Sequence, residues 1–241
     1  MKTILIIQAR MGSSRLPGKI LFPLGETVVL DYVVSRCKQI DQLYDVIVAT
    51  STLEQDDAIA EWCAATQTTC FRGSEGDVLS RYYECAKTYI PDYVIRVTSD
   101  CPFIDHEIAS ELIKIMASGP SDLITLEGEL PRGLWSEMVS FKALEYMYKH
   151  GQEPRHREHV TYYAYEHTDQ FQTAHYRVSD SMRHPELRIT LDTPEDYAML
   201  QKISDHFTGD RLISSRRVVE YLLEHPEVIA LNAHIQQKPV L

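Results

Sequence analysis

The sequence predicts a doubly wound α/β fold, in which helices cover both faces of a mostly parallel sheet. Two observations lead to this prediction. Short apolar runs, typical of buried parallel strands, alternate with segments whose apolar residues recur at helical spacing. Strands that alternate with helices in this way pair in parallel through right-handed crossovers. Ligands of such sheets bind outside the carboxyl ends of the strands, so the loops that follow the strands are where a site is expected.

The first half of the chain shows this alternation most clearly. Val29, Val33, Val34 and Cys37 recur at the spacing of one helix face, for example, and an apolar strand-like run follows them. We expect strands at residues 3–9, 45–50, 68–71 and 92–98, and helices at residues 28–40, 54–65, 78–89 and 105–116.

The second half has weaker strand signals, and the interval 128–137 is expected to be irregular. No shift in composition marks a second independent domain. We therefore expect one domain over residues 1–241, with an inserted region around 127–180 for acceptor binding or dimerisation. The expected strands are 122–126, 171–178 (antiparallel or at an edge) and 187–191, and the expected helices are 141–150, 156–167, 194–207 and 215–223.

The overall charge excludes one class of partner. Lys and Arg total 24 and Asp and Glu total 35, so the formal net charge is −11. A general nucleic-acid binder would need a basic surface, whereas this chain has more acidic than basic residues. A polyanionic nucleotide would have to be captured by a local basic pocket. No apolar run reaches the ~18 residues that a membrane-spanning helix requires.

The five cysteines, an odd number with no Cys-x-x-Cys pair, favour free thiols in a reducing cytosol. The amino-terminal residues do not resemble a signal peptide. We therefore expect a cytoplasmic protein without membrane contact, working as a homodimer.

The segment 8–19, with the sequence QARMGSSRLPGK, is the most informative part of the chain. It opens directly from an expected buried strand and combines two glycines, two serines, two arginines and a lysine. Gly12 is expected to adopt positive φ, and Arg10, Arg15 and Lys19 would neutralise phosphate oxygens. A solvated basic loop is the plainer interpretation. As an exposed side chain, Lys19 would contribute little to folding.

Two aspartates stand where expected strands end. Asp100 follows the strand at 92–98, and Asp192 follows the run 187–191. A pair of carboxylates completed by phosphate oxygens is a ligand set that Mg²⁺ accepts. The alternative is structural, because Asp residues commonly cap turns and helices, and Thr193 or Asp192 is well placed to cap the helix at 194–207.

Two smaller patches also carry suitable chemistry. The segment 72–82 places a glycine-rich turn before a helix, where an anion or a ribose hydroxyl is accepted, although simple capping by Ser74 or Asp77 explains it as well. Arg155 and His159 share a face at i, i+4 spacing and are expected to hold a carboxylated substrate; a solvated charged face is the alternative.

Taken together, five segments resemble the spore coat polysaccharide biosynthesis protein F family, which is akin to the CMP-Kdo synthetases and the acylneuraminate cytidylyltransferases. They occur in that family's order over most of the chain: QARMGSSRLPGK at 8–19, RGSEGDVLSRY at 72–82, RVTSDCPFID at 96–105, REHVT at 157–161 and RITLDTPEDY at 188–197.

The resemblance implies a nucleotide-diphospho-sugar transferase fold and Mg²⁺-dependent transfer of CMP from CTP to an acidic sugar or a related small acidic acceptor. It also implies residue roles. Asp100 and Asp192 would be the metal carboxylates, acting with Lys19 and Arg15 in catalysis. The residues expected to bind the nucleotide are Gln8, Ala9, Arg10, Gly12, Ser13, Arg15, Lys19, Arg72, Asp77 and Arg81.

The sequence departs from that family at one place. The family often shows Gly-Leu-Asp-Val-Glu, whereas this chain has Trp135 where Asp is usual and keeps Glu137. An indole replaces a carboxylate with an aromatic face, so Trp135 and Glu137 are expected to shape the acceptor site. Two other functions stay open: a nucleotide-sugar-dependent glycosyltransferase, although the Asp-x-Asp pair is missing at Asp100-Cys101-Pro102, and a non-catalytic nucleotide-binding protein of a glycan cluster.

Overall fold

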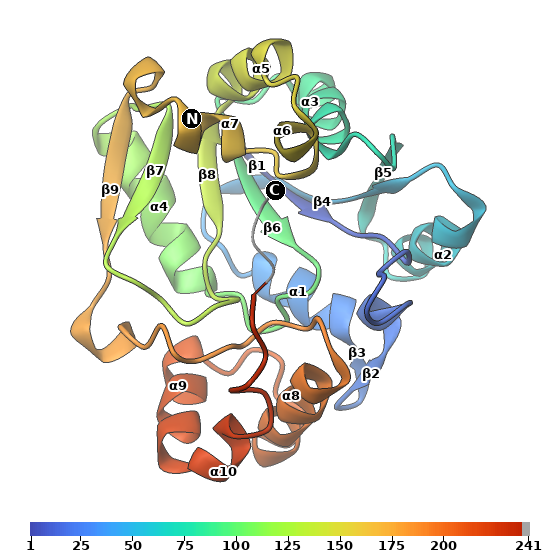
Figure 1. The fold of residues 1–241 in the computed structure, drawn as a ribbon. Coiled ribbons are helices and arrows are strands. Elements are labelled where there is room, and N and C mark those ends of the chain that lie inside the picture. The colour runs from blue at the N-terminus through green and yellow to red at the C-terminus, as the bar shows by residue number, and fades with distance from the viewer. Residues whose placement is uncertain (238–241) are drawn as a thin grey trace.

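The computed structural model describes residues 1–237, and a seven-stranded sheet forms its centre. Figure 1 shows this sheet with helices on both faces. The strands lie in the order β5-β4-β1-β6-β8-β7-β9. Their bounds are Thr3–Gln8 for β1, Leu43–Ser51 for β4, Thr69–Gly73 for β5, Tyr93–Thr98 for β6, Leu123–Glu127 for β7, Glu137–Ser140 for β8 and Thr173–Arg177 for β9.

The sheet is mostly parallel, as expected. β1 pairs in parallel with both β4 and β6, and β4 pairs in parallel with β5. β8 runs antiparallel to its neighbours β6 and β7, while β9 at the edge pairs in parallel with β7. The chain first builds outward from β1 through β4 to β5 and then returns to the other side of β1 with β6. This change of direction opens a crevice at the carboxyl ends of β1 and β6, where ligands of doubly wound sheets bind.

The central strands are buried on both faces, which is why they are continuous apolar runs. Leu5 and Ile7 point into one core, with α1 (Val29–Cys37), α2 (Asp57–Ala65) and α4 (His106–Ser118). Ile4 and Ile6 point into the other, with α3 (Val78–Tyr89), α5 (Phe141–His150) and α7 (Tyr162–Glu166).

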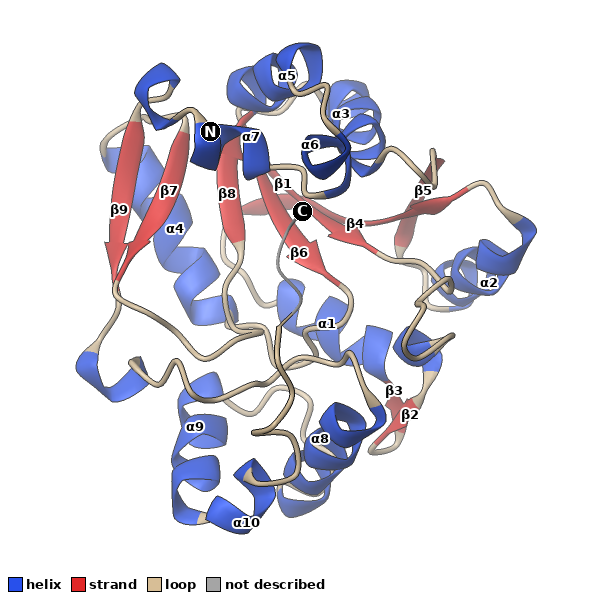
Figure 2. Cartoon of the chain, viewed as in Figure 1, coloured by secondary structure: helices blue, strands red, loops and turns tan. Residues whose placement is uncertain are grey.

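The remaining elements surround this frame (Figure 2). The helices α8, α9 and α10 lie beyond the carboxyl ends of the central strands (Figure 1), and the short α6 lies beside α3. Their bounds are Pro154–Glu158 for α6, Pro194–His206 for α8, Ser215–Glu224 for α9 and Pro226–Ile229 for α10. A hairpin of β2 (Pro23–Leu24) and β3 (Thr27–Val28) and four short 3-10 helices complete the description: Lys19–Leu21, Glu54–Asp56, Thr168–Gln170 and Asp180–Met182.

Several expected elements need correction. The run 187–191 is not a strand of the sheet and makes only an isolated bridge, between Arg132 and Arg188. The helix expected at 156–167 is two short helices, α6 and α7. The strand expected at 171–178, antiparallel or at an edge, is β9, which does lie at the edge of the sheet and pairs in parallel with β7. The strands β2, β3 and β8 and the helix α10 were not predicted, because each is four residues long or shorter.

All five cysteines are free thiols, as expected, and four of them are buried. Within residues 1–237, no helix has both the length and the apolar composition that a membrane crossing requires.

Candidate active site

Two adjoining cavities open at the carboxyl ends of β1 and β6. The first, about 530 Å³, lies against the segment 8–19 and the start of α3, and we call it the loop-side cavity. The second, about 880 Å³, lies between the loop 126–137, the segment 185–192 and the tail 232–237, and we call it the tail-side cavity. The residues that line both are Gln8, Arg15, Thr98, Asp100, Arg132, Glu158, His159, Asp192 and Gln237.

The segment 8–19 is an ordered loop that ends in a 3-10 turn. Its left-handed residue is Gly18, with φ of +72°, and not Gly12 as expected. The backbone N–H of Met11 donates to the buried carboxylate of Asp56, and that of Gly18 donates to the carbonyl of Met11. Within the described chain no hydrogen bond uses the backbone N–H groups of Gly12, Ser14 and Arg15, so the loop retains donors for an anion.

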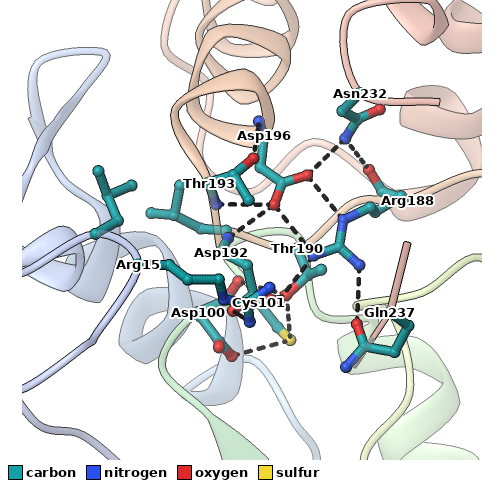
Figure 3. A network of polar contacts seen from close by, with 12 residues as sticks. Arg15, Asp100, Cys101, Arg188, Thr190, Asp192, Thr193, Asp196, Asn232 and Gln237 are labelled. Atoms are coloured by element: carbon teal, nitrogen blue, oxygen red, sulfur yellow. Dashed lines mark hydrogen bonds and ion pairs between the residues drawn. The ribbon is translucent and has the colours of Figure 1, made fainter. Parts of the chain in front are cut away.

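Lys19 joins Asp100, which follows β6, to Asp192, which precedes α8. Its Nζ donates to Asp100 Oδ2 over 3.0 Å and to Asp192 Oδ1 over 2.9 Å. Arg15 Nη2 lies 2.8 Å from Asp192 Oδ1. The Lys19 side chain is 9% exposed, so the expectation of an exposed lysine is wrong. The four residues expected to act together in catalysis therefore meet at the wall of the loop-side cavity. Figure 3 shows Arg15 against Asp192.

Backbone hydrogen bonds explain why Asp192 reaches Asp100. The N–H of Leu191 donates to the carbonyl of Asp100 over 2.8 Å, and the hydroxyl of Thr190 donates to the same oxygen. On the other side, the N–H of Ile189 donates to the carbonyl of Arg132 over 2.7 Å. The segment 187–191 thus fixes two loops instead of joining the sheet. Thr193 then caps α8, as the structural interpretation of this region predicted.

The ion pairs set the charges of this group. Burial lowers the pKa of Lys19, but the charges of Asp100 and Asp192 outweigh it, so the pKa lies above its usual value. Burial raises the pKa of Asp192, but Lys19, Arg15 and Arg188 reverse the effect and hold the pKa below its usual value. At neutral pH, Lys19 is therefore a cation and Asp192 an anion.

The two carboxylates suit a magnesium ion that shares its coordination with phosphate. They face the same ammonium group, so both point toward one position. In the described chain no cluster of three or more His, Cys, Asp or Glu residues forms a complete metal cage. Mg²⁺ characteristically takes one or two carboxylates and completes its shell with water and substrate phosphates, and the pair fits that pattern.

The other residues expected to bind nucleotide divide into two groups. Ala9, Arg10, Ser13 and Arg81 line the loop-side cavity together with Gln8. Gln8 Oε1 and Arg81 Nε are buried and have no hydrogen-bond partner in residues 1–237, which is unusual unless a ligand supplies one. Gly12, Arg72 and Asp77 do not line this cavity.

The structure assigns Arg72 and Asp77 other contacts. Arg72 donates to the carbonyls of Ser51 and Leu53 and pairs with Asp57 at 2.6 Å, so it fixes the connection between β4 and α2. Asp77 caps α3 by accepting from the N–H of Ser80.

The residues expected to bind the acceptor are also separated. Trp135 and Glu137 line the tail-side cavity, and His159 lines both cavities. Arg155 lines neither, because it pairs with Glu153 and Glu166. His159 is the C-cap of α6, and its N–H donates to the carbonyl of Arg155, but only His159 lines the cavities, so the structure does not bring the two side chains together at the site.

A buried ion pair forms the wall beside Trp135. Glu137 accepts from Arg96, Thr161 and Tyr165, and Arg96 stands opposite Glu137 in the pairing of β6 with β8. Burial raises the pKa of Glu137, but Arg96 outweighs it, so the pKa lies below its usual value. Trp135 is half-buried, and its ring centroid lies 6.0 Å from that of Tyr176.

Sequence analysis missed three functional candidates. Arg188 pairs with Asp192, Asp196 is fully buried beneath both, and Arg132 is exposed between the two cavities. The available signal was the spacing Arg188-x-x-x-Asp192-x-x-x-Asp196, in which a cation stands between carboxylates four and eight positions away.

Comparisons with known proteins agree with this geometry. The model of the family described as cytidylyltransferase matches residues 4–233. The chain is 33% identical to the spore coat polysaccharide biosynthesis protein SpsF of Bacillus subtilis, over 93% of this chain and 95% of that protein.

Solved structures show the same fold. A cytidylyltransferase from Leptospira borgpetersenii superposes with a TM-score of 0.90 at 31% identity, covering 99% of this chain and all of that one. A CMP:2-keto-3-deoxy-manno-octonic acid synthetase complexed with CTP superposes with a TM-score of 0.67 at 16% identity, covering 86% of this chain and all of that one. The fold is thus that of the nucleotide-diphospho-sugar transferases, and the chain belongs to the cytidylyltransferase family.

Proposed function

We propose that this protein transfers CMP from CTP to a small acidic acceptor, such as an acidic sugar, and releases pyrophosphate, in the biosynthesis of a surface polysaccharide. One observation carries the proposal. Arg15 and Lys19, from the loop after β1, meet Asp100 and Asp192 where two cavities adjoin. The arrangement offers separate spaces for a triphosphate and an acceptor on either side of one charged group.

The loop-side cavity is proposed to hold CTP. Arg10, Arg15 and Lys19 provide positive charge, and Ser14 and Arg15, which also line the cavity, have backbone N–H groups without a hydrogen bond in residues 1–237. In this cavity Arg81 is buried and retains an unpaired Nε. A triphosphate would compete with Asp192 for Arg15 and Lys19, because phosphate oxygens and carboxylates bind the same donors.

Asp100 and Asp192 are proposed to hold Mg²⁺ when the nucleotide is bound. The ion would supply charge neutralisation on the phosphates and acidify the acceptor hydroxyl. When the triphosphate recruits Arg15 and Lys19, Asp192 Oδ1 loses two hydrogen-bond donors and becomes free to accept other positive charge. In the structure, Lys19, Arg15 and Arg188 hold the pKa of Asp192 below its usual value and so keep this carboxylate ionised.

The tail-side cavity is proposed to hold the acceptor. Arg132 is exposed there and has no ion pair within residues 1–237, so it is available for a carboxylate of the acceptor. Trp135 offers an aromatic face to an apolar substituent. The acceptor oxygen attacks the α-phosphorus of CTP in line and forms a new P–O bond while the bond to pyrophosphate breaks. The proton of the acceptor hydroxyl passes to water. Positioning and charge neutralisation account for most catalysis of this kind.

Nucleotide preference tests the proposal most directly. CTP with Mg²⁺ should raise the thermal stability of the protein more than ATP, GTP or UTP does. At a free concentration ~100 times its dissociation constant, a ligand adds about 2.7 kcal/mol to the free energy of unfolding. Pyrophosphate release with CTP and a panel of acidic sugars then identifies the acceptor. Stronger stabilisation by another nucleotide would overturn the assignment of CTP.

We also propose that the protein is a cytoplasmic homodimer in which the region around 127–180 contributes to the interface. Sedimentation velocity of the full chain measures the oligomeric state. A monomer at micromolar concentration would contradict this part of the proposal.

A further inference from the structure

Arg188 binds the carboxylate oxygen of Asp192 that Lys19 does not contact. Its Nη2 donates to Asp192 Oδ2 over 2.8 Å, whereas Lys19 and Arg15 contact Oδ1. The two carboxylate oxygens therefore have different partners. Arg188 keeps one oxygen directed into the protein and leaves the other directed toward the cavities.

Arg188 is itself held by a second, fully buried carboxylate. Its Nε lies 2.8 Å from Asp196 Oδ1, and its Nη2 lies 3.1 Å from Asp196 Oδ2. Asp196 also accepts from the backbone N–H groups of Asp192 and Thr193. A planar guanidinium reaches all of these positions at once, which a single ammonium group cannot do.

The carboxyl-terminal tail is attached to the same group. The side-chain amide of Asn232 donates to the carbonyl of Arg188 and to Asp196 Oδ1, both over 2.9 Å. Five residues further on, Gln237 Oε1 accepts from Arg188 Nη1 over 3.0 Å. Every nitrogen of the guanidinium thus has a partner, and Figure 3 shows Arg188 between the tail and the aspartates.

The tail also forms a wall of the proposed acceptor site. The segment after α10 turns back toward β6 (Figure 1), and Asn232, Ala233, Ile235 and Gln237 line the tail-side cavity. Gln237 lines the loop-side cavity as well. A segment that closes the cavity therefore contacts the residue that orients Asp192.

We propose that Arg188 is a positioning residue for Asp192 and that the tail 232–237, held through Gln237, completes the active site by fixing Arg188. This inference rests on the proposed function, because it assigns Asp192 to the metal and the tail-side cavity to the acceptor. Docking of the tail and the orientation of Asp192 are then coupled. A substitution that weakens the docking of the tail should also leave the Asp192 carboxylate less well positioned.

The experiment uses the full chain and two variants. Gln237→Ala removes one contact to Arg188 and leaves every buried ion pair in place. Arg188→Lys keeps the positive charge but cannot contact Asp192, Asp196 and Gln237 together. Gln236→Ala is the matched control, because Gln236 is the same residue type at the preceding position and lines neither cavity.

Two readouts separate positioning from a purely structural role. The first is the dissociation constant of Mn²⁺ in the presence of CTP without acceptor, measured from the electron paramagnetic resonance of free Mn²⁺. The second is the separation of kcat from the KM for CTP in the transfer reaction. Gln237→Ala should weaken Mn²⁺ binding about 3-fold and lower kcat by a similar factor, as expected for one hydrogen bond to a charged group. The KM for CTP should change less than about 2-fold.

Arg188→Lys should act in the same direction and more strongly, by about 10-fold or more, because it loses several charged hydrogen bonds. Gln236→Ala should match the wild type. Equal Mn²⁺ affinity and kcat in Gln237→Ala and Gln236→Ala would overturn the role of the tail. A lower melting temperature of Arg188→Lys with unchanged Mn²⁺ affinity would overturn the positioning role.

The wild type separates this inference from the function on which it rests. If it binds Mn²⁺ with CTP and transfers CMP, a null result in the variants counts against the tail and Arg188 alone. If it does neither, the proposed function fails, and the inference fails with it.

Discussion

Lys19 Nζ donates to Asp192 Oδ1 over 2.9 Å, although the two residues stand 173 positions apart in the chain. The contact joins the loop after the first strand to the segment that precedes α8. Because Lys19 is almost fully buried, it acts both as a structural link and as a candidate ligand for phosphate. Because of this double role, substitution of Lys19 should reduce both the stability of the protein and its binding of CTP, whereas substitution of a surface lysine should affect neither.

Replacing Lys19 with Met should lower the free energy of unfolding by about 1–3 kcal/mol, since the substitution removes a charged donor from both Asp100 Oδ2 and Asp192 Oδ1. The same variant should lose most of its stabilisation by CTP. Chemical denaturation with and without CTP measures both effects. Lys87→Met is the control, because Lys87 is 59% exposed and its contacts with Glu84 and the Tyr83 ring are at the surface. Equal stability of the two variants would contradict the structural role of Lys19.

Asp100→Asn and Asp192→Asn should each reduce turnover on the order of 100-fold or more, because Asn lacks the charge that Mg²⁺ requires. Circular dichroism checks that each variant keeps its fold, and Asp205→Asn on the exposed side of α8 is the control. Normal turnover in either variant would return that aspartate to a capping role.

The contribution of Asp192 to stability should disappear in acid. Its pKa in the folded protein is lowered, so its stabilising effect is present above the ordinary carboxyl pKa of about 4 and is lost as the pH falls through the lowered value. The difference in unfolding free energy between the wild type and Asp192→Asn should therefore be constant near neutral pH and shrink in acid. A difference that grows on acidification would contradict this sign.

The opposite sign applies to Lys19, whose pKa in the folded protein is raised. Its contribution is fully present below the usual lysine pKa of about 10.4 and is lost as the pH rises through the raised value. The stability difference between the wild type and Lys19→Met should shrink only in strong alkali. A loss that is complete near neutral pH would show that Lys19 is not held as a cation.

Trp135→Asp should shift acceptor preference toward a more hydroxylated acidic sugar, with little change in CTP binding. An apolar wall discriminates weakly, whereas a group that bonds a hydroxyl discriminates strongly. Competition between two acceptors in one reaction measures the shift, and Trp135→Phe, which keeps the aromatic face, is the control. If Trp135 serves only packing, the Asp variant should instead lose ~3 kcal/mol of stability without any change in preference.

Gly133→Ala should destabilise the protein by more than about 1 kcal/mol, because the residue has positive φ. Its φ is +100°, and an added Cβ would lie 2.2 Å from the carbonyl oxygen of Ile189. Thermal unfolding measures the loss. Gly119→Ala is the matched control, because no atom lies within 4 Å of a Cβ at that position. Equal melting temperatures would show that the loop 126–137 tolerates displacement from the segment 187–191.

The parts of the fold that were predictable have strong local patterns. The helix expected at 78–89 is observed with the same bounds, because its apolar face and its capping Asp77 both lie within the local sequence. The parallel strands were recognisable because burial on both faces makes them continuously apolar. The meeting of the loop 8–19 with Asp100 was predictable because β1 and β6 are parallel neighbours whose carboxyl ends share one edge. Asp192 was expected in the group as a strand-end residue, but it follows a segment that is not a strand of the sheet.

The parts that failed depend on distant contacts. The run 187–191 has strand-like residues, but its N–H groups donate to carbonyls of the loops at Asp100 and Arg132. These groups are therefore not available for pairing with a strand of the sheet. Arg155 was placed with His159 on the assumption of a continuous helix, which α6 does not provide. The role of Arg188 depends on its contacts with Asn232 and Gln237. No local sequence pattern indicates that the segment after α10 returns to the site.

The distance in sequence between Lys19 and Asp192 has a consequence for protein synthesis. Chains begin to fold from the amino terminus as they leave the ribosome. The loop 8–19 and the strands β1, β4 and β6 emerge long before the segment 187–192, and Asn232 and Gln237 follow later still. A nascent chain therefore carries Lys19 with only one of its two carboxylate partners, Asp100, until Asp192 has been synthesised. Catalytic activity should accordingly require that synthesis has passed the segment 187–192 and residues 232–237.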